Sequence, residues 1–281
     1  MSNYHTKEVP YFYHIELNVS DLETMMQFYT NVIGLQVLFN EKNRVILGVS
    51  KHPLITLYRN KSTTRNQGLY HFALLLENRI ELANVLYHLL SIDYPLTGAS
   101  DHIISEAIYF NDPEGNGIEL AVDRDKSFWP YSNGNLDIMY RNKPLDIPDL
   151  LENATSNGPI QLSSNTVLGH IHLHVHDVVK TGEFYKKVLN MDTTIDLTPS
   201  ALFLSYAGYH HHVAINTWNT YKIANESDEN LGLRSLFLQS PDDTYFELIK
   251  NRLHKHSVFF TSDDDILSFD DPAKHHIIIT K

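Results

Sequence analysis

His102–Glu119 reads H-I-I-S-E-A-I-Y-F-N-D-P-E-G-N-G-I-E, and this stretch decides how the chain around it folds. An apolar run that carries Tyr109 is followed by D-P-E-G at residues 112–115. Such a sequence is typical of a tight turn, because proline fixes φ and glycine relaxes the backbone. A second apolar run carries Glu119. The pattern predicts two antiparallel strands that place Tyr109 and Glu119 close together.

Length, charge and cysteine content narrow the function classes. The chain has 281 residues, enough for two domains that each bury a core. With 22 basic and 34 acidic residues the formal net charge is −12, which argues against nucleic acid or an anionic membrane as a partner, because both require basic surface. The absence of cysteine excludes disulfides, a thiolate metal site and a cysteine nucleophile.

The first ten residues give no sign of export or membrane insertion. M-S-N-Y-H-T-K-E-V-P lacks a basic region followed by an apolar one, and no apolar stretch is long enough to span a bilayer. We therefore expect a cytoplasmic protein. The sequence leaves the oligomeric state open, with a homo-oligomer among the alternatives.

The chain before residue 60 shows an order of elements that recurs later. Residues 11–19 alternate apolar and polar side chains, as a strand does. Ser20 and Glu23 have the spacing of a capping box ahead of an amphipathic helix, which Gly34 ends. Three strand-like runs follow, at residues 36–39, 45–49 and 54–58. The order is strand, helix and three strands.

This order repeats with recognisable sequence at an offset of 156 residues. Eight identities fall within nineteen positions without a gap, so that His14, Ile15, Leu17, Val19, Asp21, Phe28, Tyr29 and Val32 match His170, Ile171, Leu173, Val175, Asp177, Phe184, Tyr185 and Val188. Such a match is hard to obtain by chance. The chain therefore contains a duplicated half.

Each half holds a second copy of the same order. In the first half this copy has a strand from Gly68, then a helix and two strands at residues 80–90, 103–110 and 118–122. In the later half Gly232 opens a similar strand, and residues 241–253 read as a helix. The sequence thus predicts an α+β protein of four βαβββ modules.

The modules pair into two predicted domains, at residues 8–125 and 166–281. Residues 126–165 between them are rich in Pro, Asn, Ser and Gly and form a predicted linker. Within it, Asn133-Gly134 predicts a hairpin turn and residues 148–153 predict a short helix.

The modules, the gapless repeat and the length resemble the vicinal-oxygen-chelate superfamily, which includes glyoxalases, bleomycin resistance proteins and extradiol dioxygenases. The resemblance covers nearly the whole chain and implies two glyoxalase-like domains whose curled mixed sheets form cups. Within the superfamily the chain is similar to the bacillary catechol 2,3-dioxygenases. The shared runs are L-Y-H-F-A (69–73), D-P-E-G-N-G-I-E (112–119), G-H-I-H-L-H-V (169–175) and Y-H-H-H (209–212).

The opening stretch resembles the signature of type I extradiol ring-cleaving dioxygenases. In that signature a histidine, an apolar residue and a tyrosine precede an acidic-Pro-x-Gly turn and a glutamate, here His102, Ile108, Tyr109, Asp112, Pro113, Gly115 and Glu119. One position departs, because Ser100 stands where the pattern has Gly, Asn, Thr or an aliphatic residue.

The resemblance implies a metal site in the first half. Ligands in the superfamily come from the first strand of one module and from the first and last strands of its partner, positions that here are His14, His71 and Glu119. Two imidazoles and one carboxylate form the facial triad of non-haem Fe(II) oxygenases, and such donors also accept Mn(II).

Two further roles follow from the signature. His102 is implied as a proton carrier beside the bound oxygen, because imidazole titrates near neutral pH, and Tyr109 as a hydrogen-bond partner of the substrate oxygen. The implied reaction opens a catechol-type aromatic ring next to its hydroxyls with both atoms of O2, as in aromatic compound degradation. The aromatic residues do not distinguish catechol, a substituted catechol and a hydroquinone.

The later half of the chain also carries a group of histidines. His170, His172, His174 and His176 alternate along one predicted strand and therefore share a face, yet the partner positions carry Ser235 and Ile278 instead of histidine and glutamate. We interpret this half as a degenerate copy that braces the first. A second site using His170 with His210 or His212 stays open.

Each of these residues also has an ordinary structural explanation. A lone strand histidine such as His14 is more often structural than a ligand, so the site depends on all three positions together. Rival functions are a metal-dependent thiol transferase or glyoxalase-like enzyme and a non-catalytic drug-binding protein. Residues 54–58 carry no acid, which counts against the isomerase.

Overall fold

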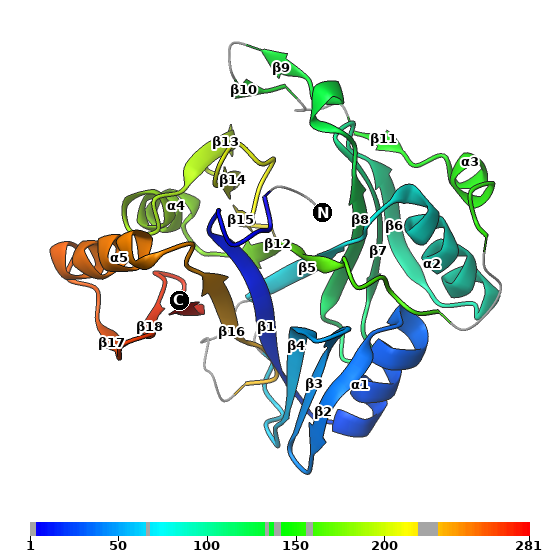
Figure 1. The fold of residues 1–281 in the computed structure, drawn as a ribbon, viewed down its shortest axis with the longest axis horizontal. Helices are drawn as coiled ribbons and strands as arrows, with labels where there is room; N and C mark the ends of the chain where they lie inside the picture. The colour runs from blue at the N-terminus through cyan, green and yellow to red at the C-terminus, as the bar shows by residue number, and fades with distance from the viewer. Residues whose placement is uncertain (1–3, 66–67, 133–134, 138–141, 156–159, 219–229) are drawn as a thin grey trace. The chain divides into compact units, whose positions relative to one another are not determined.

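The computed structural model describes residues 4–65, 68–132, 135–137, 142–155, 160–218 and 230–281. Within these residues the strands form two mixed sheets, of eight and nine strands, and a separate two-stranded sheet (Figure 1). The chain divides into two compact units, which we describe separately. Unit 1 is Met1–Ser20, Asn60–Tyr70 and Gly169–Lys281, and unit 2 is Asp21–Arg59 and His71–Leu168.

Four βαβββ modules follow one another along the chain, as the sequence predicts. Their elements are β1 (Tyr11–Val19), α1 (Leu22–Phe28), β2 (Gln36–Glu41), β3 (Arg44–Val49) and β4 (His52–Arg59); β5 (Leu69–Leu75), α2 (Arg79–Ser91), β6 (Leu96–Asp101), β7 (Ser105–Asn111) and β8 (Gly117–Asp123); β12 (Val167–His174), α4 (Val178–Lys187), β13 (Asp192–Leu197), β14 (Ala201–Ser205) and β15 (Val213–Asn216); and β16 (Gly232–Gln239), α5 (Asp243–Lys255), β17 (Phe260–Ser262), β18 (Ile266–Asp270) and β19 (His276–Thr280). The α+β class is confirmed.

The first helix of unit 2 corrects one sequence prediction. Asp21, not Ser20, is the N-cap of α1, because its extended backbone lets its carboxylate accept from the Thr24 N–H at 3.1 Å. After Phe28 the helix continues as one π-helical stretch, Tyr29–Ile33. Gly34 ends it with a φ of 94°, as predicted.

One strand of unit 2 is absent from the prediction. β6 reads L-T-G-A-S-D, with few of the β-branched and aromatic residues that mark a strand, yet it pairs antiparallel with β7. Pairing with β7 fixes β6 where its own propensity does not. The strand completes the second module and ends at Asp101, directly before His102.

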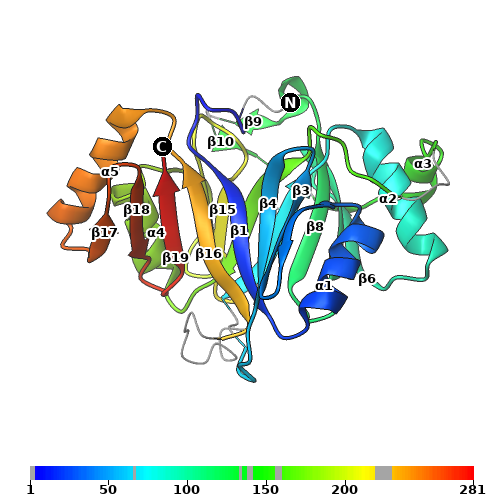
Figure 2. The same cartoon turned by 60° about the horizontal axis from the view of Figure 1, so that its bottom comes forward.

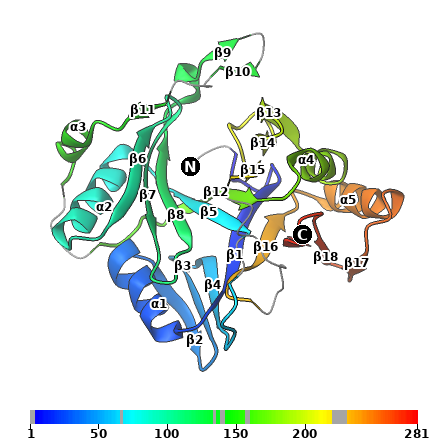
Figure 3. The ribbon, with the colours of Figure 1, turned by 180° about the vertical axis from the view of Figure 1, so that it is seen from behind.

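The turn between β7 and β8 forms as predicted. Asp112 Oδ1 accepts from the backbone N–H groups of Glu114 and Asn116, at 3.0 and 2.8 Å, and Gly115 has a φ of 80°. The two strands pair antiparallel with Tyr109 opposite Glu119. Figure 3 shows these strands beside β6, with α2 next to them.

Each unit has a buried tyrosine–aspartate hydrogen bond at matching positions of the repeat. In unit 2 the Tyr29 hydroxyl donates to Asp112 Oδ2 at 3.0 Å, and in unit 1 the Tyr185 hydroxyl donates to Asp271 Oδ2 at 3.1 Å. Each bond joins the helical region of one module to the last turn of the next. The aspartate of the D-P turn is therefore a tertiary contact as well as a turn residue.

Unit 1 brings the two ends of the chain together. β1 pairs antiparallel with β16, and β16 pairs parallel with β19, so these three strands lie side by side (Figure 2). The first strand of the first module thus has the first strand of the last module as a neighbour. The predicted domain boundaries stay a prediction. Unit 1 combines residues 1–20 and 60–70 of the first half with residues 169–281.

Three histidines of unit 1 lie on β12, and the predicted fourth does not. β12 ends at His174, so His176 lies beyond the strand and is exposed, because the chain turns there into the Asp177 N-cap of α4. The predicted helix at 241–253 forms as α5, two residues later, behind its N-cap Asp242.

The predicted linker contains two short elements that lie near their expected positions. β9 (Tyr131–Ser132) and β10 (Asn135–Leu136) pair antiparallel, while the predicted turn at residues 133–134 lies outside the described residues. The short helix is α3 (Ile147–Leu151), and a 3-10 turn (Lys126–Phe128) and β11 (Lys143–Pro144) complete the elements. Among the described residues, no helix has the length and apolar content needed to cross a membrane.

Candidate active site

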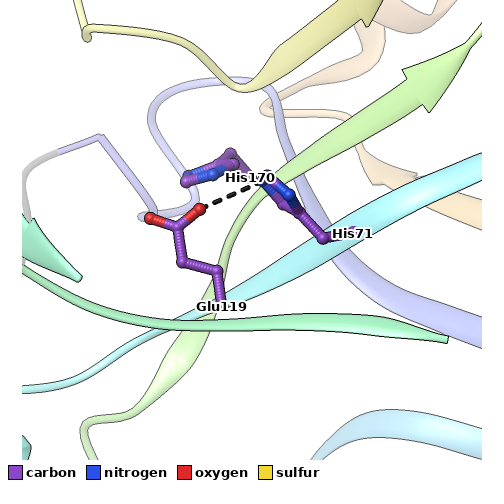
Figure 4. Close-up of side chains that lie close together, drawn as sticks. All are labelled: His71, Glu119 and His170. Atoms are coloured by element: carbon purple, nitrogen blue, oxygen red, sulfur yellow. Dashed lines mark ion pairs between the residues drawn. The ribbon is translucent and has the colours of Figure 1, made fainter. Parts of the chain in front are cut away.

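A buried histidine–glutamate pair marks the candidate site in unit 2. His71 lies on β5 and Glu119 on β8, and these two strands are parallel neighbours with Ala73 opposite Glu119. The two side chains point toward each other (Figure 4), and His71 Nε2 lies 3.0 Å from Glu119 Oε2. The residues are 9% and 3% exposed. Burying an ionisable pair is costly unless its members bind each other or a third charged group, so the pair has the character of a functional site.

Tyr109 and His102 extend this pair toward the turn after β6. Tyr109 faces Glu119 across β7 and β8, and its ring centroid lies 5.7 Å from that of His71. The Tyr109 hydroxyl lies 2.6 Å from His102 Nε2. The structure therefore brings four of the five sequence-predicted site residues together within unit 2.

The short contact between His102 and Tyr109 suits proton transfer. At 2.6 Å the hydroxyl and the imidazole nitrogen form a hydrogen bond, and the tautomer of the imidazole decides which of them donates. Both side chains are partly exposed, whereas the His71–Glu119 pair is buried. The His102–Tyr109 pair is therefore more exposed to solvent than the His71–Glu119 pair beside it.

The fifth predicted residue, His14, lies in unit 1. It belongs to β1, is 7% exposed, and packs edge-on against Phe237 of β16 at 5.1 Å between ring centroids. His170, the residue that matches it in the repeat, lies on β12 in the same unit and is 4% exposed; Figure 4 also draws it. Both are buried imidazoles on the first strand of a module.

A known protein is similar to this chain over most of its length. A Bacillus subtilis (strain 168) protein named Catechol-2,3-dioxygenase is 36% identical over 252 residues, which is 86% of each of the two chains. The chain belongs to the glyoxalase/bleomycin resistance protein/dioxygenase superfamily. The model of that superfamily matches residues 11–120, the part that contains the candidate site.

Two further proteins are similar to this chain. A virulence protein of Salmonella typhimurium is 30% identical over 118 residues, 38% of this chain and 81% of its own length. The crystal structure of glyoxalase I from Zea mays matches with a TM-score of 0.59 at 16% identity and covers 97% of this chain and 92% of that chain. The second match shows a similar fold.

A second site that uses His170 with His210 or His212 stays a prediction, and the structure shows what His212 contacts. His212 Nδ1 accepts from the Tyr206 backbone N–H at 3.2 Å, and His212 Nε2 lies 3.0 Å from the Tyr4 carbonyl oxygen, to which it donates. Both ring nitrogens are therefore used. Among the described residues, neither His210 nor His212 joins His170 in a group of three close ligand atoms.

Unit 1 keeps His212 neutral, which predicts a loss of stability in acid. Burial, together with neighbouring His5, His210 and His170, holds the pKa of His212 well below its usual value of 6.5. At a pH between the folded pKa of His212 and 6.5, this histidine binds a proton in the unfolded chain but not in the folded one. The free energy of unfolding therefore decreases as the pH is lowered, by up to about 1.4 kcal/mol per pH unit. Urea unfolding of metal-free protein at pH 7.5 and 5.5 measures this slope.

A matched pair of variants assigns that slope to the buried imidazole. His212→Gln is expected to reduce the acid slope, whereas His256→Gln, at an exposed position after α5, is expected to leave it unchanged. An equal slope in the wild type and His212→Gln would contradict the assignment.

The sequence did not reveal two features of the site. Asp101 and Arg124 contact the turn between β6 and β7 that carries His102. The sequence did not indicate them, because it did not predict β6. The role of Asp112 in binding Tyr29 was also missed, although Tyr29 and Asp112 both have matching residues in the repeat, Tyr185 and Asp271, which was the available signal.

Proposed function

We propose that this protein is a metal-dependent, extradiol-type ring-cleaving dioxygenase that acts on a catechol-type aromatic and O2. The observation that carries the proposal is the buried His71–Glu119 pair beside the 2.6 Å contact of Tyr109 with His102. The extradiol signature implies His102, Tyr109 and Glu119, and the superfamily resemblance implies His71. The relative named Catechol-2,3-dioxygenase, similar over 86% of the chain, supports the same reaction class.

The donor set fits the metal that the superfamily implies. His71, Glu119 and His170 are residue types whose ligand atoms could hold a metal ion, and two imidazoles with one carboxylate are the donors of non-haem Fe(II) sites. Mn(II) accepts the same donors. When bound, such an ion supplies a centre that an aromatic diol and dioxygen can approach together and through which electrons can pass.

The second imidazole of the set comes from unit 1 in this proposal, and there are two candidates. The sequence assigns His14, if consecutive modules pair. The pairing of β1 with β16 favours His170 instead, because it gives the first module the fourth as its partner and leaves the third module for the second. The first strand of the third module is β12, which carries His170.

The chain's own side chains account for the proton movements of the proposed reaction. A diol that binds through its oxygens must lose protons, and the ring-opened product must regain one. His102 Nε2 can take such a proton and return it, while the Tyr109 hydroxyl donates to the substrate oxygen and exchanges its hydrogen with His102. The burial of His71 and Glu119 keeps bulk water away from the donors.

The His102–Tyr109 contact also separates this proposal from the rival functions. A thiol transferase of the same superfamily needs the metal donors but no such pair, and a drug-binding protein needs neither. The contact therefore favours the dioxygenase.

Oxygen uptake tests the proposal directly. We expect protein loaded with Fe(II) without air to consume O2 when offered a small panel of catechols, with a yellow ring-opened product. Tyr109→Phe and His102→Gln are expected to retain the metal and to lower kcat by about 100- to 10,000-fold, the usual contribution of a positioned acid or base. Stoichiometric metal without uptake would support the transferase, and absence of metal would support a binding protein.

A further inference from the structure

The turn that carries His102 is held in a conformation that its own sequence does not favour. Ile103, directly after His102, has a φ of 72°, in the left-handed region that β-branched residues rarely adopt. Such a residue persists only where surrounding contacts fix it, and it often marks a functional site. The contacts that fix Ile103 therefore also fix the position of His102.

Those contacts come from Asp101 and Arg124. Asp101 Oδ1 accepts from the Ile103 backbone N–H at 2.8 Å, and Arg124 Nη1 donates to the Ile103 carbonyl oxygen at 3.0 Å. Arg124 also binds both carboxylate oxygens of Asp101, with Nη2 3.0 Å from Oδ2. Both backbone polar groups of Ile103 are thus held by one bidentate ion pair.

Asp101 and Arg124 each stabilise the charged form of the other. The guanidinium of Arg124 holds the pKa of Asp101 below its ordinary value, so the carboxylate stays ionised, and Asp101 in turn raises the pKa of Arg124. The planar fork of arginine matches a carboxylate in two places, which lysine cannot do. The pair is therefore specific for arginine.

Arg124 is also anchored to the strands that carry the site. Its Nη2 donates to Glu106 Oε1 of β7 at 3.0 Å, and its backbone N–H donates to the Ile104 carbonyl oxygen at 2.7 Å. It directly follows β8, the strand of Glu119. One guanidinium thus connects the ends of β6, β7 and β8, between which the His102 turn lies.

We propose that Arg124, acting with Asp101, is a positioning residue that holds His102 Nε2 at the Tyr109 hydroxyl. Neither Arg124 nor Asp101 contacts the reacting atoms in this assignment. Their role is to keep the turn in the one conformation in which the imidazole reaches the hydroxyl. This inference rests on the proposed function, which gives His102 and Tyr109 their proton-transfer role.

Arg79 supplies a matched control within the same ionic network. Its Nε donates to the other oxygen of Glu106 at 2.6 Å, and its Nη2 binds Asp149, but its bonds do not include Asp101 or Ile103. Arg79→Gln therefore removes an arginine from buried Glu106 without releasing the His102 turn. A general loss of network stability would affect both arginine variants equally.

The first measurement uses metal-free protein and no substrate. In ¹⁵N-histidine NMR spectra, the His102 signals are assigned by their disappearance in His102→Gln. We expect Arg124→Gln and Asp101→Asn to shift or broaden the His102 ring signals, as loss of the contact with Tyr109 would, and Arg79→Gln to leave them in place. Unchanged His102 signals in Arg124→Gln would overturn the inference whether or not the protein is a dioxygenase.

The second measurement follows turnover of the loaded enzyme. Arg124→Gln is expected to lower kcat by about 10- to 100-fold with KM changed less than about threefold, because a misplaced catalytic group slows chemistry more than it weakens binding. Arg124→Lys is expected to recover little, since it cannot bind Asp101 in two places. An equal fall of kcat in Arg79→Gln would reduce Arg124 to a structural role.

Discussion

Glu119→Gln is expected to abolish metal binding and oxygen-dependent turnover together. The amide keeps the size of the side chain but removes the charge that neutralises a divalent cation. Removing a residue that only hydrogen-bonds to a metal ligand lowers metal affinity about 10- to 100-fold. Removing the carboxylate ligand itself should therefore lower it more than about 100-fold. Metal content after anaerobic loading with Fe(II) and desalting, measured beside O2 uptake, checks this prediction.

An exposed carboxylate in the same unit provides the control for Glu119→Gln. Glu152→Gln, at the end of α3, is expected to retain both metal and activity, because this side chain is exposed and far along the chain from the site strands. Glu119→Gln protein that still holds one metal per chain would place the metal elsewhere.

Two histidine variants decide which residue of unit 1 completes the donor set. If the third module is the partner of the second, His170→Ala loses the metal and His14→Ala keeps it. The opposite result would support the pairing of consecutive modules and His14 as the ligand, as the superfamily resemblance implies. Circular dichroism and urea unfolding of both metal-free variants would show that each still folds.

Asp112→Ala is expected to lower the free energy of unfolding by about 3–5 kcal/mol. The Asp112 side chain is buried and accepts from the Tyr29 hydroxyl, the Asn116 side chain and two backbone N–H groups of its turn. Alanine would leave these donors without an acceptor, and each buried donor left unsatisfied costs about 1–3 kcal/mol. Urea unfolding of metal-free protein measures the difference.

Tyr29→Phe is the matched variant for this prediction. It removes one hydrogen bond and keeps the buried ring, so we expect a loss of about 1 kcal/mol. The buried Asp271, which accepts from Tyr185 and lies 2.9 Å from His275, should respond to alanine in the same way in unit 1. A loss below about 1 kcal/mol in Asp112→Ala would show that the turn forms without its carboxylate.

Local signals in the sequence predicted most of the fold. The D-P-E-G turn, the period-two run at residues 11–19 and Gly34 each depend on contacts within a few residues, and each formed as expected. β6 was missed because its strand conformation comes from pairing with β7 rather than from its own residues. The pairing of β1 with β16 has no local signal at all, since it depends on long-range packing.

The candidate site was predictable to the extent that it lies on one short stretch. His102, Tyr109 and Glu119 are within eighteen consecutive positions, and the pairing of β7 with β8 places the last two opposite each other. His71 needed the superfamily resemblance. The Asp101–Arg124 pair could not be predicted, because it depends on where β6 ends and on the left-handed backbone of Ile103.

The pairing of the first strand with one near the end of the chain has a consequence during synthesis on the ribosome. Tyr11 pairs with Gln239, so about 230 residues must be translated before β1 can meet this partner. At about 5–20 residues per second, β1 waits for about 10 to 45 seconds with that edge uncovered. An uncovered edge invites pairing with other chains, so nascent chains that stall before residue 232 should depend on chaperones to remain unaggregated.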